Sequence, residues 1–387
     1  MYFEPYPFEK LNTLLKEITP NPSCEAIALT IGEPQFETPV FIQEALKNNT
    51  RLLNKYPKSS GEAYVMEAQR QFVQRRFGVE LHHDELISTF GTREVLFNFP
   101  QFLLHGKLEP VMAYTNPFYQ IYEGAAIASR AKVLHLDLTP ENGFKPDLNL
   151  GALHTADLVI LNFPNNPTGV SLGLEELGEW VKLALKYDFV LLNDECYSEI
   201  YTDTPPPSLL EASVYIGNER FKNILVVNSI SKRSSAPGLR SGFIAGDGAI
   251  LRAYAHYRSY VGAGIPLPLQ VASSIAWSDD EHVELARAQY RANLALAREI
   301  LGVDTTDTTF YVWLDVGDGE GFTKALYEQK NIKVLPGKYL ARGGIADAYV
   351  RIALVENHVK TEHILKEIQS FKQTWALEEA AINADEI

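Results

Sequence analysis

Short apolar runs rich in β-branched residues alternate with longer amphipathic segments between about residues 85 and 245. The runs cover residues 110–116, 157–164, 189–195, 223–231 and 241–246. Apolar runs of this length also occur as buried helix turns, but the β-branched content and the stops at Asn, Asp, Pro and Gly favour strands. Strands that alternate with helices form a mostly parallel sheet with helices on both faces. This part of the chain is therefore predicted to be an α/β domain.

The pattern changes in the last third of the chain. Residues 281–301 form a long charged segment whose apolar residues recur three and four positions apart, which predicts an amphipathic helix. Three short strands and a final helix are predicted after it, over residues 308–316, 333–337, 347–355 and about 360–375. We therefore expect a large domain over residues 45–276. Residues 1–44 and 277–387 are expected to form an N-terminal arm and a smaller α+β domain.

Length and charge narrow the possible functions. A chain of 387 residues exceeds the usual size of one hydrophobic core, so two packed lobes are expected. The formal net charge of -14 argues against sequence-independent binding to nucleic acid, which depends on Lys and Arg neutralising phosphates. An acidic substrate would therefore need a local positive pocket.

The N-terminus and the cysteines indicate the cellular compartment of the protein. The first ten residues, MYFEPYPFEK, lack a basic region followed by an apolar run, and no apolar stretch reaches membrane-spanning length. Two cysteines, Cys24 and Cys196, suggest neither a disulfide framework nor a metal cluster. We expect a cytoplasmic protein with no membrane partner and no metal site.

Polar side chains follow four of the predicted strands. Tyr119, Asn166 and Asp194 each come at or just after the end of one run, and Ser229 and Lys232 come at the end of another. Ligands in open α/β sheets bind beyond the carboxyl ends of the strands. These side chains are therefore predicted to meet in one site.

The segment NSISKRSSAPGLRSG, residues 228–242, carries the most specific chemistry. Lys232 lies between hydroxyl side chains, and Arg240 follows eight residues later. A lysine amine condenses with an aldehyde, while Ser229 and Arg240 can hold a dianionic phosphate. This combination suits pyridoxal 5'-phosphate as a covalent cofactor. The simpler alternative is a surface lysine in a loop rich in Ser and Gly.

This segment resembles the lysine motif of class I aminotransferases of the pyridoxal-phosphate fold type I superfamily. NDECYSEIY and NFPNNPTG resemble two further motifs of that family. The resemblance implies an aspartate aminotransferase-like fold, with a seven-stranded sheet between helices. It also implies that Asp194 contacts the pyridine nitrogen, and that Tyr197 and Asn166 contact the phenolic oxygen. Lys232, Asp194 and Tyr197 are then the catalytic residues. An N-cap for Asp194 and an ordinary turn for Asn166 are the structural alternatives.

Three more segments match motifs of the same family. In STFGTREVLFNF, the resemblance makes Gly91 and Thr92 phosphate ligands, although a simple turn before a helix would look similar. In NPFYQIY it makes Tyr119 the residue that stacks on the cofactor ring, and a buried aromatic pair with Tyr122 is the alternative. Tyr56, in KYPKSSG, matches a tyrosine that reaches the phosphate of a neighbouring subunit. A homodimer with a shared active site follows from it.

Arg351 and Gly32 are the candidates for substrate binding, together with Asn166. An arginine within the apolar pattern YVRIALV is costly to bury unless it meets an anion, and a bidentate arginine suits the α-carboxylate of an amino acid. Gly32 matches a family glycine whose backbone lines the substrate pocket. Lys232 then carries a proton between substrate and cofactor. The partners are an amino acid and a 2-oxo acid, in ping-pong order.

Among the class I enzymes, the chain resembles the succinyldiaminopimelate aminotransferase subgroup. The resemblance rests on PYPFEKL, GTRE, NPFYQIYEGA and SKRSSAPGLRSGFIAGD, and it covers nearly the whole chain. It implies a bacterial enzyme of lysine and diaminopimelate biosynthesis that uses glutamate and N-succinyl-2-amino-6-oxopimelate. An aspartate or aromatic aminotransferase, a carbon–sulfur β-lyase and a pyridoxal-binding regulator are the alternatives. Arg233, Arg258 and Lys58 are unranked candidates for the second carboxylate of glutamate.

Overall fold

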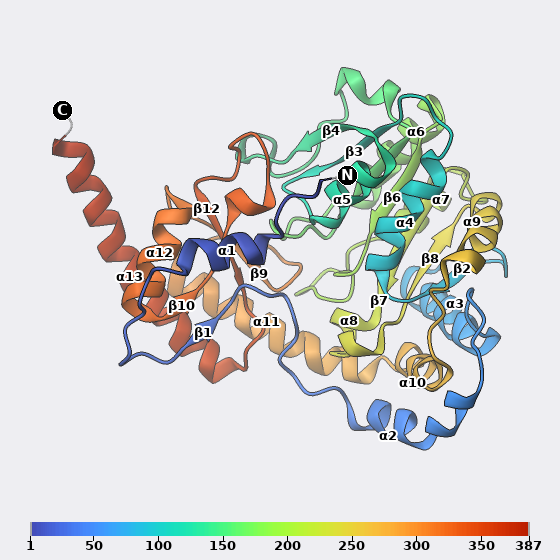
Figure 1. Cartoon of the computed structure of the whole chain (residues 1–387), viewed down its shortest axis with the longest axis horizontal. Helices are drawn as coiled ribbons and strands as arrows, with labels where there is room; N and C mark the ends of the chain where they lie inside the picture. The colour runs from blue at the N-terminus through green and yellow to red at the C-terminus, as the bar shows by residue number, and fades with distance from the viewer. Residues whose placement is uncertain (1, 386–387) are drawn as a thin grey trace.

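The larger half of the molecule is built on one seven-stranded sheet, as the computed structural model of residues 2–385 shows (Figure 1). Across the sheet the strands are β2 (Leu86–Thr89), β8 (Gly242–Gly246), β7 (Ile224–Ser229), β6 (Val190–Asp194), β5 (Leu158–Leu161), β3 (Val111–Asn116) and β4 (Lys132–Asp137). β8 runs antiparallel to both of its neighbours, whereas the other adjacent strands pair in parallel. The predicted mostly parallel sheet is confirmed.

Both faces of this sheet are buried under helices. Successive side chains of a strand point to opposite faces, so Leu158 and Ile160 enter one core while Val159 and Leu161 enter the other. The helices of the first core are α4 (Thr92–Leu104), α5 (Ile121–Ser129) and α9 (Gly248–Val261). Those of the second are α3 (Ala63–Phe77), α6 (Leu174–Tyr187), α7 (Leu209–Tyr215) and α10 (Leu267–Ser278). This double cover explains why the strands read as continuous apolar runs.

The smaller half contains a three-stranded antiparallel sheet in the order β11, β12, β9. These strands are Leu335–Pro336, Tyr349–Ala353 and Tyr311–Asp315, respectively. Helices α11 (Glu281–Leu301), α12 (Gly319–Lys330) and α13 (His358–Asp385) supply the rest of its core. The strand predicted over residues 333–337 is divided in two, because β10 (Ile332–Lys333) pairs with β1 (Ile27–Ala28) and β11 pairs with β12.

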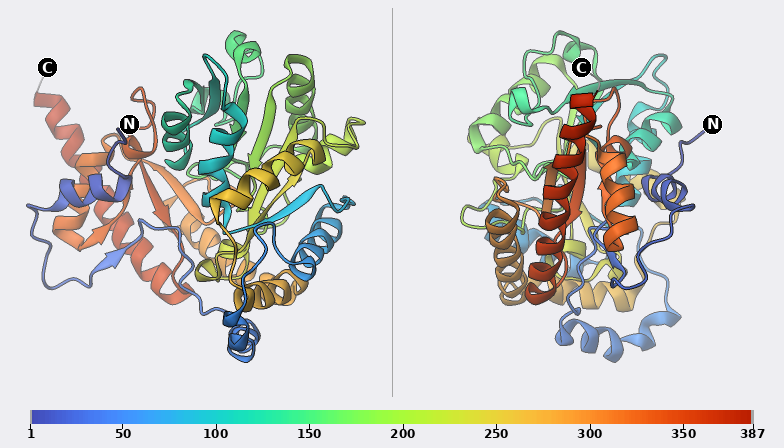
Figure 2. Two further views of the ribbon diagram at one scale, coloured as in Figure 1. Left: turned by 45° about the vertical axis from the view of Figure 1, so that its right-hand side comes forward. Right: turned by 90° about the vertical axis from the view of Figure 1, so that its left-hand side faces the viewer.

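The N-terminal segment contacts both halves (Figure 2). Helix α1 (Pro7–Leu15) packs its leucines against Leu335 and Leu340 of the smaller half. Helix α2 (Val40–Asn48) places Ile42 in the core of the larger half. The domain limits at residues 44 and 276 remain a prediction. Within residues 2–385, no helix is long and apolar enough to cross a membrane.

We expect Phe99→Ala to lower the free energy of unfolding by about 3–5 kcal/mol. Phe99 is fully buried on α4, and its ring meets the edge of Tyr254 with 5.1 Å between centroids. Denaturant titration measures the effect, with Val359→Ala as the control because the Val359 side chain is 77% exposed. A loss for Phe99→Ala as small as that of the control would contradict this packing.

Candidate active site

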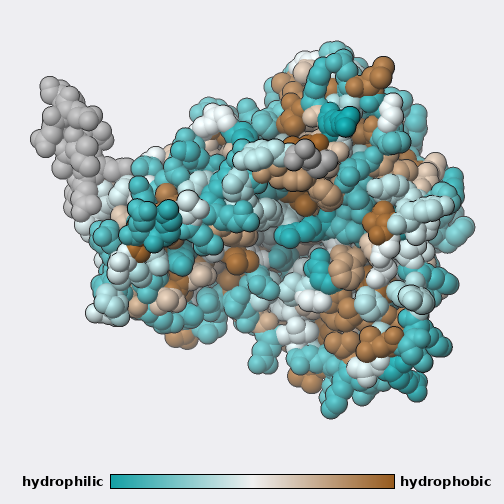
Figure 3. Space-filling model, in the orientation of Figure 1, coloured by the Kyte–Doolittle hydropathy of each residue, from teal (hydrophilic) through white to brown (hydrophobic). Residues whose placement is uncertain are grey.

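A cavity of about 860 Å³ brings ten of the twelve predicted site residues together. The ten are Gly32, Thr92, Tyr119, Asn166, Asp194, Tyr197, Ser229, Lys232, Arg240 and Arg351. On the face shown in Figure 3, the surface is hollowed between the two halves of the molecule. Gly91 borders this site through Arg240, whereas Tyr56 is fully exposed and lies outside the cavity. The strand ends therefore meet as predicted.

Lys232 lies on α8 (Ile230–Arg233), a single helical turn that directly follows β7. Its Nζ donates a hydrogen bond to the carbonyl oxygen of Gly32, from the N-terminal segment. Burial of the amine lowers the pKa of Lys232 to about 8. A fraction of the amine is therefore neutral near pH 7, and the neutral form is the nucleophile.

Asp194 is buried at the end of β6. Tyr122 Oη donates to its carboxylate at 3.0 Å, and the backbone N–H of Cys196 donates at 3.3 Å. Burial raises the pKa of Asp194, although these hydrogen bonds and the charge of Lys232 oppose the rise. No lysine or arginine of the described chain forms a salt bridge with Asp194. This carboxylate therefore lines the cavity without a salt-bridge partner among the described residues.

Arg351 enters the cavity from β12 of the smaller half. Its Nη1 donates to Asn166 Oδ1 at 2.8 Å, and its Nη2 donates to the carbonyl oxygen of Thr30 at 2.5 Å. The guanidinium lies 4.4 Å from the centre of the Tyr311 ring, and its buried Nε has no acceptor among the described residues. Arg351 thus has an unused donor and no carboxylate partner in residues 2–385.

Tyr311 also positions Tyr197, because the two hydroxyl oxygens are 2.8 Å apart. The same ring explains why residue 32 is glycine. A Cβ at Gly32 would overlap Tyr311 Oη, so any side chain there would displace the tyrosine. Tyr311 was not among the predicted site residues, since it lies within a strand pattern that gives no sign of its contacts.

Hydroxyl groups and one arginine gather at another part of the cavity. Thr92 Oγ1 and Ser229 Oγ lie 3.3 Å and 3.6 Å from Cys196 Sγ. Arg240 donates to the carbonyl oxygens of Pro237 and Phe90, at 2.8 Å and 3.4 Å. Burial lowers the pKa of Arg240, and the charge of Arg93 adds to this effect. Within the described residues Arg240 has no carboxylate partner, so the arrangement suits an anion.

Gly91 makes room for that arginine. Its φ is +72°, a conformation that favours glycine, and a Cβ there would overlap Arg240 Nη2. Gly91 is also the N-cap of α4, the helix that begins at Thr92. The backbone N–H groups at a helix start attract anions as well.

Arg93 is a functional candidate that the sequence did not single out. It lines the cavity, and its Nε donates to Tyr119 Oη at 2.8 Å. Its guanidinium lies 5.8 Å from the ring centres of both Tyr119 and Tyr6. Tyr119 in turn packs edge-on against Tyr122, with 5.9 Å between centroids. The position directly after Thr92, at the first turn of a helix, is the signal in the sequence that points to Arg93.

Arg93 differs from the three cations that the sequence offered for binding the second carboxylate of glutamate. Arg258 is fully buried and pairs with both oxygens of Glu94, each at 2.9 Å. Arg233 is 1% exposed and pairs with Asp280 at 2.8 Å. Lys58 is largely exposed, lies outside the cavity and pairs with Glu62. Arg258 and Arg233 are thus committed to partners within the fold.

Comparison with known proteins identifies the family. Residues 25–368 match the family model of class I and II aminotransferases. The chain is 57% identical to aminotransferase AspB from Helicobacter pylori, with a TM-score of 0.94 over 96% of this chain and 100% of that one. It is 30% identical to the LL-diaminopimelate aminotransferase of Natranaerobius thermophilus, over 90% of this chain and 92% of the relative.

A third comparison concerns a single mutant of the aspartate aminotransferase from Thermus thermophilus. It is 25% identical, with a TM-score of 0.83 over 95% of this chain and 97% of that one. The fold is therefore aspartate aminotransferase-like, as the sequence predicted. The chain belongs to the class I and II aminotransferases, and class I enzymes of this fold depend on pyridoxal 5'-phosphate.

The residues in the cavity fit this cofactor. A phosphate dianion suits the unpaired Arg240 beside the helix start at Gly91, and a protonated pyridine nitrogen suits the buried Asp194. Lys232 contributes a lysine amine with a lowered pKa to the same cavity. The phosphate and the ring nitrogen of the cofactor thus each have an opposite charge available in the protein.

We predict that Gly91→Ala weakens the binding of pyridoxal 5'-phosphate at least tenfold, because the new Cβ would displace Arg240. Absorbance titration of the cofactor-free protein measures the dissociation constant. Gly106→Ala is the matched control, since Gly106 has a φ of +83° and a Cβ at this position would meet no atom within 4 Å. Equal cofactor affinity in the two variants would contradict the role of Gly91.

Proposed function

We propose that this aminotransferase transfers an amino group between glutamate and N-succinyl-2-amino-6-oxopimelate, a reaction of lysine and diaminopimelate biosynthesis. The observation that carries the proposal is a set of three charged groups around Lys232 that form no salt bridge in the described chain. These are Asp194, Arg240 and Arg351. Two suit the cofactor and the third suits a substrate carboxylate.

Most of the predicted residues would hold the cofactor. When bound, pyridoxal 5'-phosphate supplies an aldehyde and an electron-withdrawing ring. Asp194 would pair with the ring nitrogen, and Tyr197 and Asn166 would donate to the phenolic oxygen, which favours its anionic form. The aromatic face of Tyr119 would pack against the ring. The phosphate would be held by Gly91, Thr92, Ser229 and Arg240.

Lys232 and Arg351 would act on the substrate. Arg351, already oriented by Asn166 and Thr30, would hold the α-carboxylate through its guanidinium. A carboxylate held in one plane fixes which bond at the α-carbon faces the lysine. Lys232 Nζ would then accept the proton from the substrate α-carbon and donate it to the cofactor. Its lowered pKa favours the neutral amine, the form that accepts a proton.

Arg93 supports a substrate with a second carboxylate. Arg93 lines the same cavity as Tyr119, and Tyr6, Phe8, Phe97 and Ile31 also line it. The hydrogen-bond partners of Arg93 in the described chain are tyrosine hydroxyls, so its charge is available to an anion. Glutamate and a succinylated amino acid both carry a carboxylate remote from the α-carbon. Relatives named LL-diaminopimelate aminotransferase agree with a long substrate of this kind.

Aspartate is the second candidate substrate. It also carries two carboxylates, and a structural neighbour at 25% identity is an aspartate aminotransferase. Arg351 and Arg93 would serve this shorter substrate as well. Direct comparison of the substrates therefore decides between the two.

We also propose a homodimer in which Tyr56 completes the partner's site. Tyr56 is fully exposed, and Leu53 beside it is 71% exposed. Pro57 approaches Gly264, just beyond the end of α9, where Tyr260 is 83% exposed. An apolar surface gathered in this way suits burial against a second copy. Tyr56 would then donate to the phosphate of the partner's cofactor.

Lys232→Ala should abolish turnover and the visible absorbance band of the lysine-bound cofactor. In the wild-type protein without cofactor, the rate of condensation with pyridoxal 5'-phosphate should rise with pH and then level off, with the midpoint of the rise near pH 8. The reason is that the amine is protonated and unreactive below its pKa. Stopped-flow absorbance measures this rate. A midpoint near the ordinary lysine value, or full activity in the variant, would exclude Lys232 from the proposed role.

Arg93→Met should lower kcat/KM for glutamate and for N-succinyl-LL-diaminopimelate about 10- to 100-fold, because a hydrogen bond to a charged group is lost. Norvaline is the matched control substrate, since it lacks the second carboxylate, and its kcat/KM should change less than about threefold. Single-turnover absorbance gives each value. An equal loss for norvaline would remove Arg93 from substrate selection. A wild-type preference for aspartate over the succinylated compound would overturn the proposed substrate while leaving the aminotransferase class intact.

A further inference from the structure

Helix α11 connects the lysine segment with the sheet that carries Arg351. Its first turn lies beside the residues that follow Lys232, since His282 contacts Ser234. Its last turns place Leu294, Ala297 and Leu301 in the core beneath β9 and β12. Figure 1 shows this helix running along the lower side of the molecule from α8 toward the smaller half.

Three buried polar side chains of α11 bind three segments of the active site. His282 binds Ser234, two residues after Lys232. Arg287 Nε donates to the carbonyl oxygen of Glu199 at 3.0 Å, two residues after Tyr197. Asn293 Nδ2 donates to the carbonyl oxygens of Leu354 and Glu356, at 3.2 Å and 2.8 Å, just beyond the strand of Arg351.

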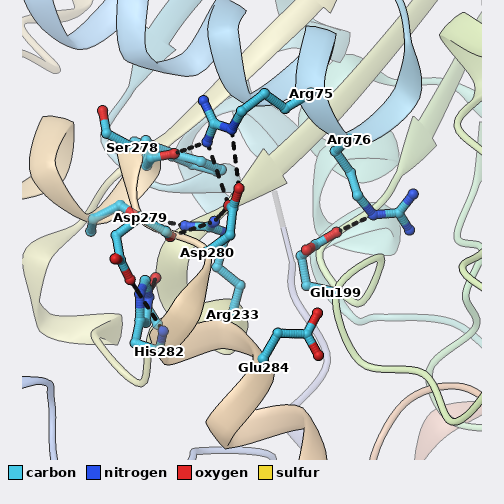
Figure 4. Close-up of polar contacts among 12 residues, drawn as sticks. Arg75, Arg76, Glu199, Arg233, Ser278, Asp279, Asp280, His282 and Glu284 are labelled. Atoms are coloured by element: carbon cyan, nitrogen blue, oxygen red, sulfur yellow. Dashed lines mark hydrogen bonds and ion pairs between the residues drawn. The ribbon is translucent and has the colours of Figure 1, made fainter.

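In the contact nearest the lysine, between His282 and Ser234, the donor and the acceptor can be assigned. His282 Nδ1 donates to Asp279, and His282 Nε2 lies 2.8 Å from Ser234 Oγ. Burial lowers the pKa of His282, although the hydrogen bond to Asp279 opposes this, so the ring is neutral at pH 7. Because Nδ1 carries the proton, Nε2 accepts, and the Ser234 hydroxyl must donate. Figure 4 shows Asp279 and His282 facing each other near Arg233.

The turn that carries Lys232 depends on such contacts. Helix α8 has four residues, too few to be stable without tertiary contacts. After it, Ser235 adopts a φ of +46°, which is strained for a residue other than glycine. The neighbouring Arg233 donates to the carbonyl oxygen of Ala276 at 2.6 Å and pairs with Asp280. The residues just after the lysine are thus fixed to the junction of α10 and α11.

We propose that His282 is a positioning residue for Lys232. His282 acts through the Ser234 hydroxyl, and this contact holds the turn that carries Lys232 in a fixed position relative to α11 and hence to Arg351. This inference rests on the proposed role of Lys232 in catalysis. Ser234 is 1% exposed, so its hydroxyl is enclosed and acts on the backbone turn rather than on substrate. Loss of the contact should displace the amine without changing the groups that bind the carboxylate.

Three variants separate this role from ordinary packing. Ser234→Ala removes the hydroxyl, whereas Ser234→Thr keeps it. His282→Asn keeps an N–H donor for Asp279 but has no atom at the position of Nε2. Ser213→Ala is the matched control, since the buried Ser213 hydroxyl on α7 donates to the carbonyl oxygen of Asn218 at 2.9 Å, outside the cavity. Thermal unfolding of each cofactor-free variant confirms that it folds.

The loss of one positioning hydrogen bond should lower kcat about tenfold in Ser234→Ala and in His282→Asn, with KM for glutamate within about twofold of wild type. The double variant should be no slower than either single variant, because both remove the same contact. Ser234→Thr should recover most of the rate. Ser213→Ala should leave kcat and KM unchanged.

A second readout uses the cofactor-free protein. Trace acylation followed by peptide mass spectrometry gives the pKa of the Lys232 amine, which should rise from about 8 toward the ordinary value when the turn loosens in Ser234→Ala. The proposal is overturned if Ser234→Ala matches Ser213→Ala in both kcat and amine titration, or if the effects of Ser234→Ala and His282→Asn multiply. Failure of the proposed function itself would be recognised separately, by full turnover in Lys232→Ala.

Discussion

The structure depends on the burial of charges that the protein does not neutralise by itself. Asp194, Arg240 and Arg351 lie in one cavity, and none forms a salt bridge within the described chain. A charge that is removed from water without an opposite partner is unfavourable. The raised pKa of Asp194 and the lowered pKa of Arg240 show burial acting on both groups. Ligands of opposite charge would relieve it, so binding and stability are coupled at this site.

Two other buried arginines, Arg258 and Arg233, have their charges neutralised by carboxylates of the protein. Arg258 is as buried as Arg351, but it meets both carboxylate oxygens of Glu94 and three backbone carbonyls. Arg233 lies between carbonyl oxygens, Asp280 and the faces of two aromatic rings. The difference between the two kinds of arginine is the carboxylate, because Arg258 and Arg233 each pair with one in the described chain, whereas Arg351 donates only to Asn166 and to a backbone carbonyl.

The sequence predicted the sheet and most of the cavity because both follow from local pattern. Strand ends meet at one edge, so Asn166, Asp194 and Lys232 could be placed together before their contacts were known. Arg93 and His282 could not be found in this way. Their contacts join residues 26 and 48 positions apart, and no periodicity records such pairs. The prediction of one continuous strand over residues 333–337 was wrong for the same reason, since its two parts pair with different strands.

The proposed substrate contacts also bear on specificity. In its proposed role, Arg351 would meet a carboxylate that every α-amino acid carries, so it would orient substrates without choosing among them. An interaction that is equal for all competitors cannot discriminate. Under the proposed function, selection would arise where substrates differ, at the part of the cavity lined by Arg93, Tyr6 and Phe97. Tyr6 comes from the N-terminal segment, which packs on the smaller half through α1. Arg93 and Phe97 lie on α4 of the larger half, which also carries Lys232, whereas Arg351 lies on β12 of the smaller half, so the proposed substrate contacts come from both halves.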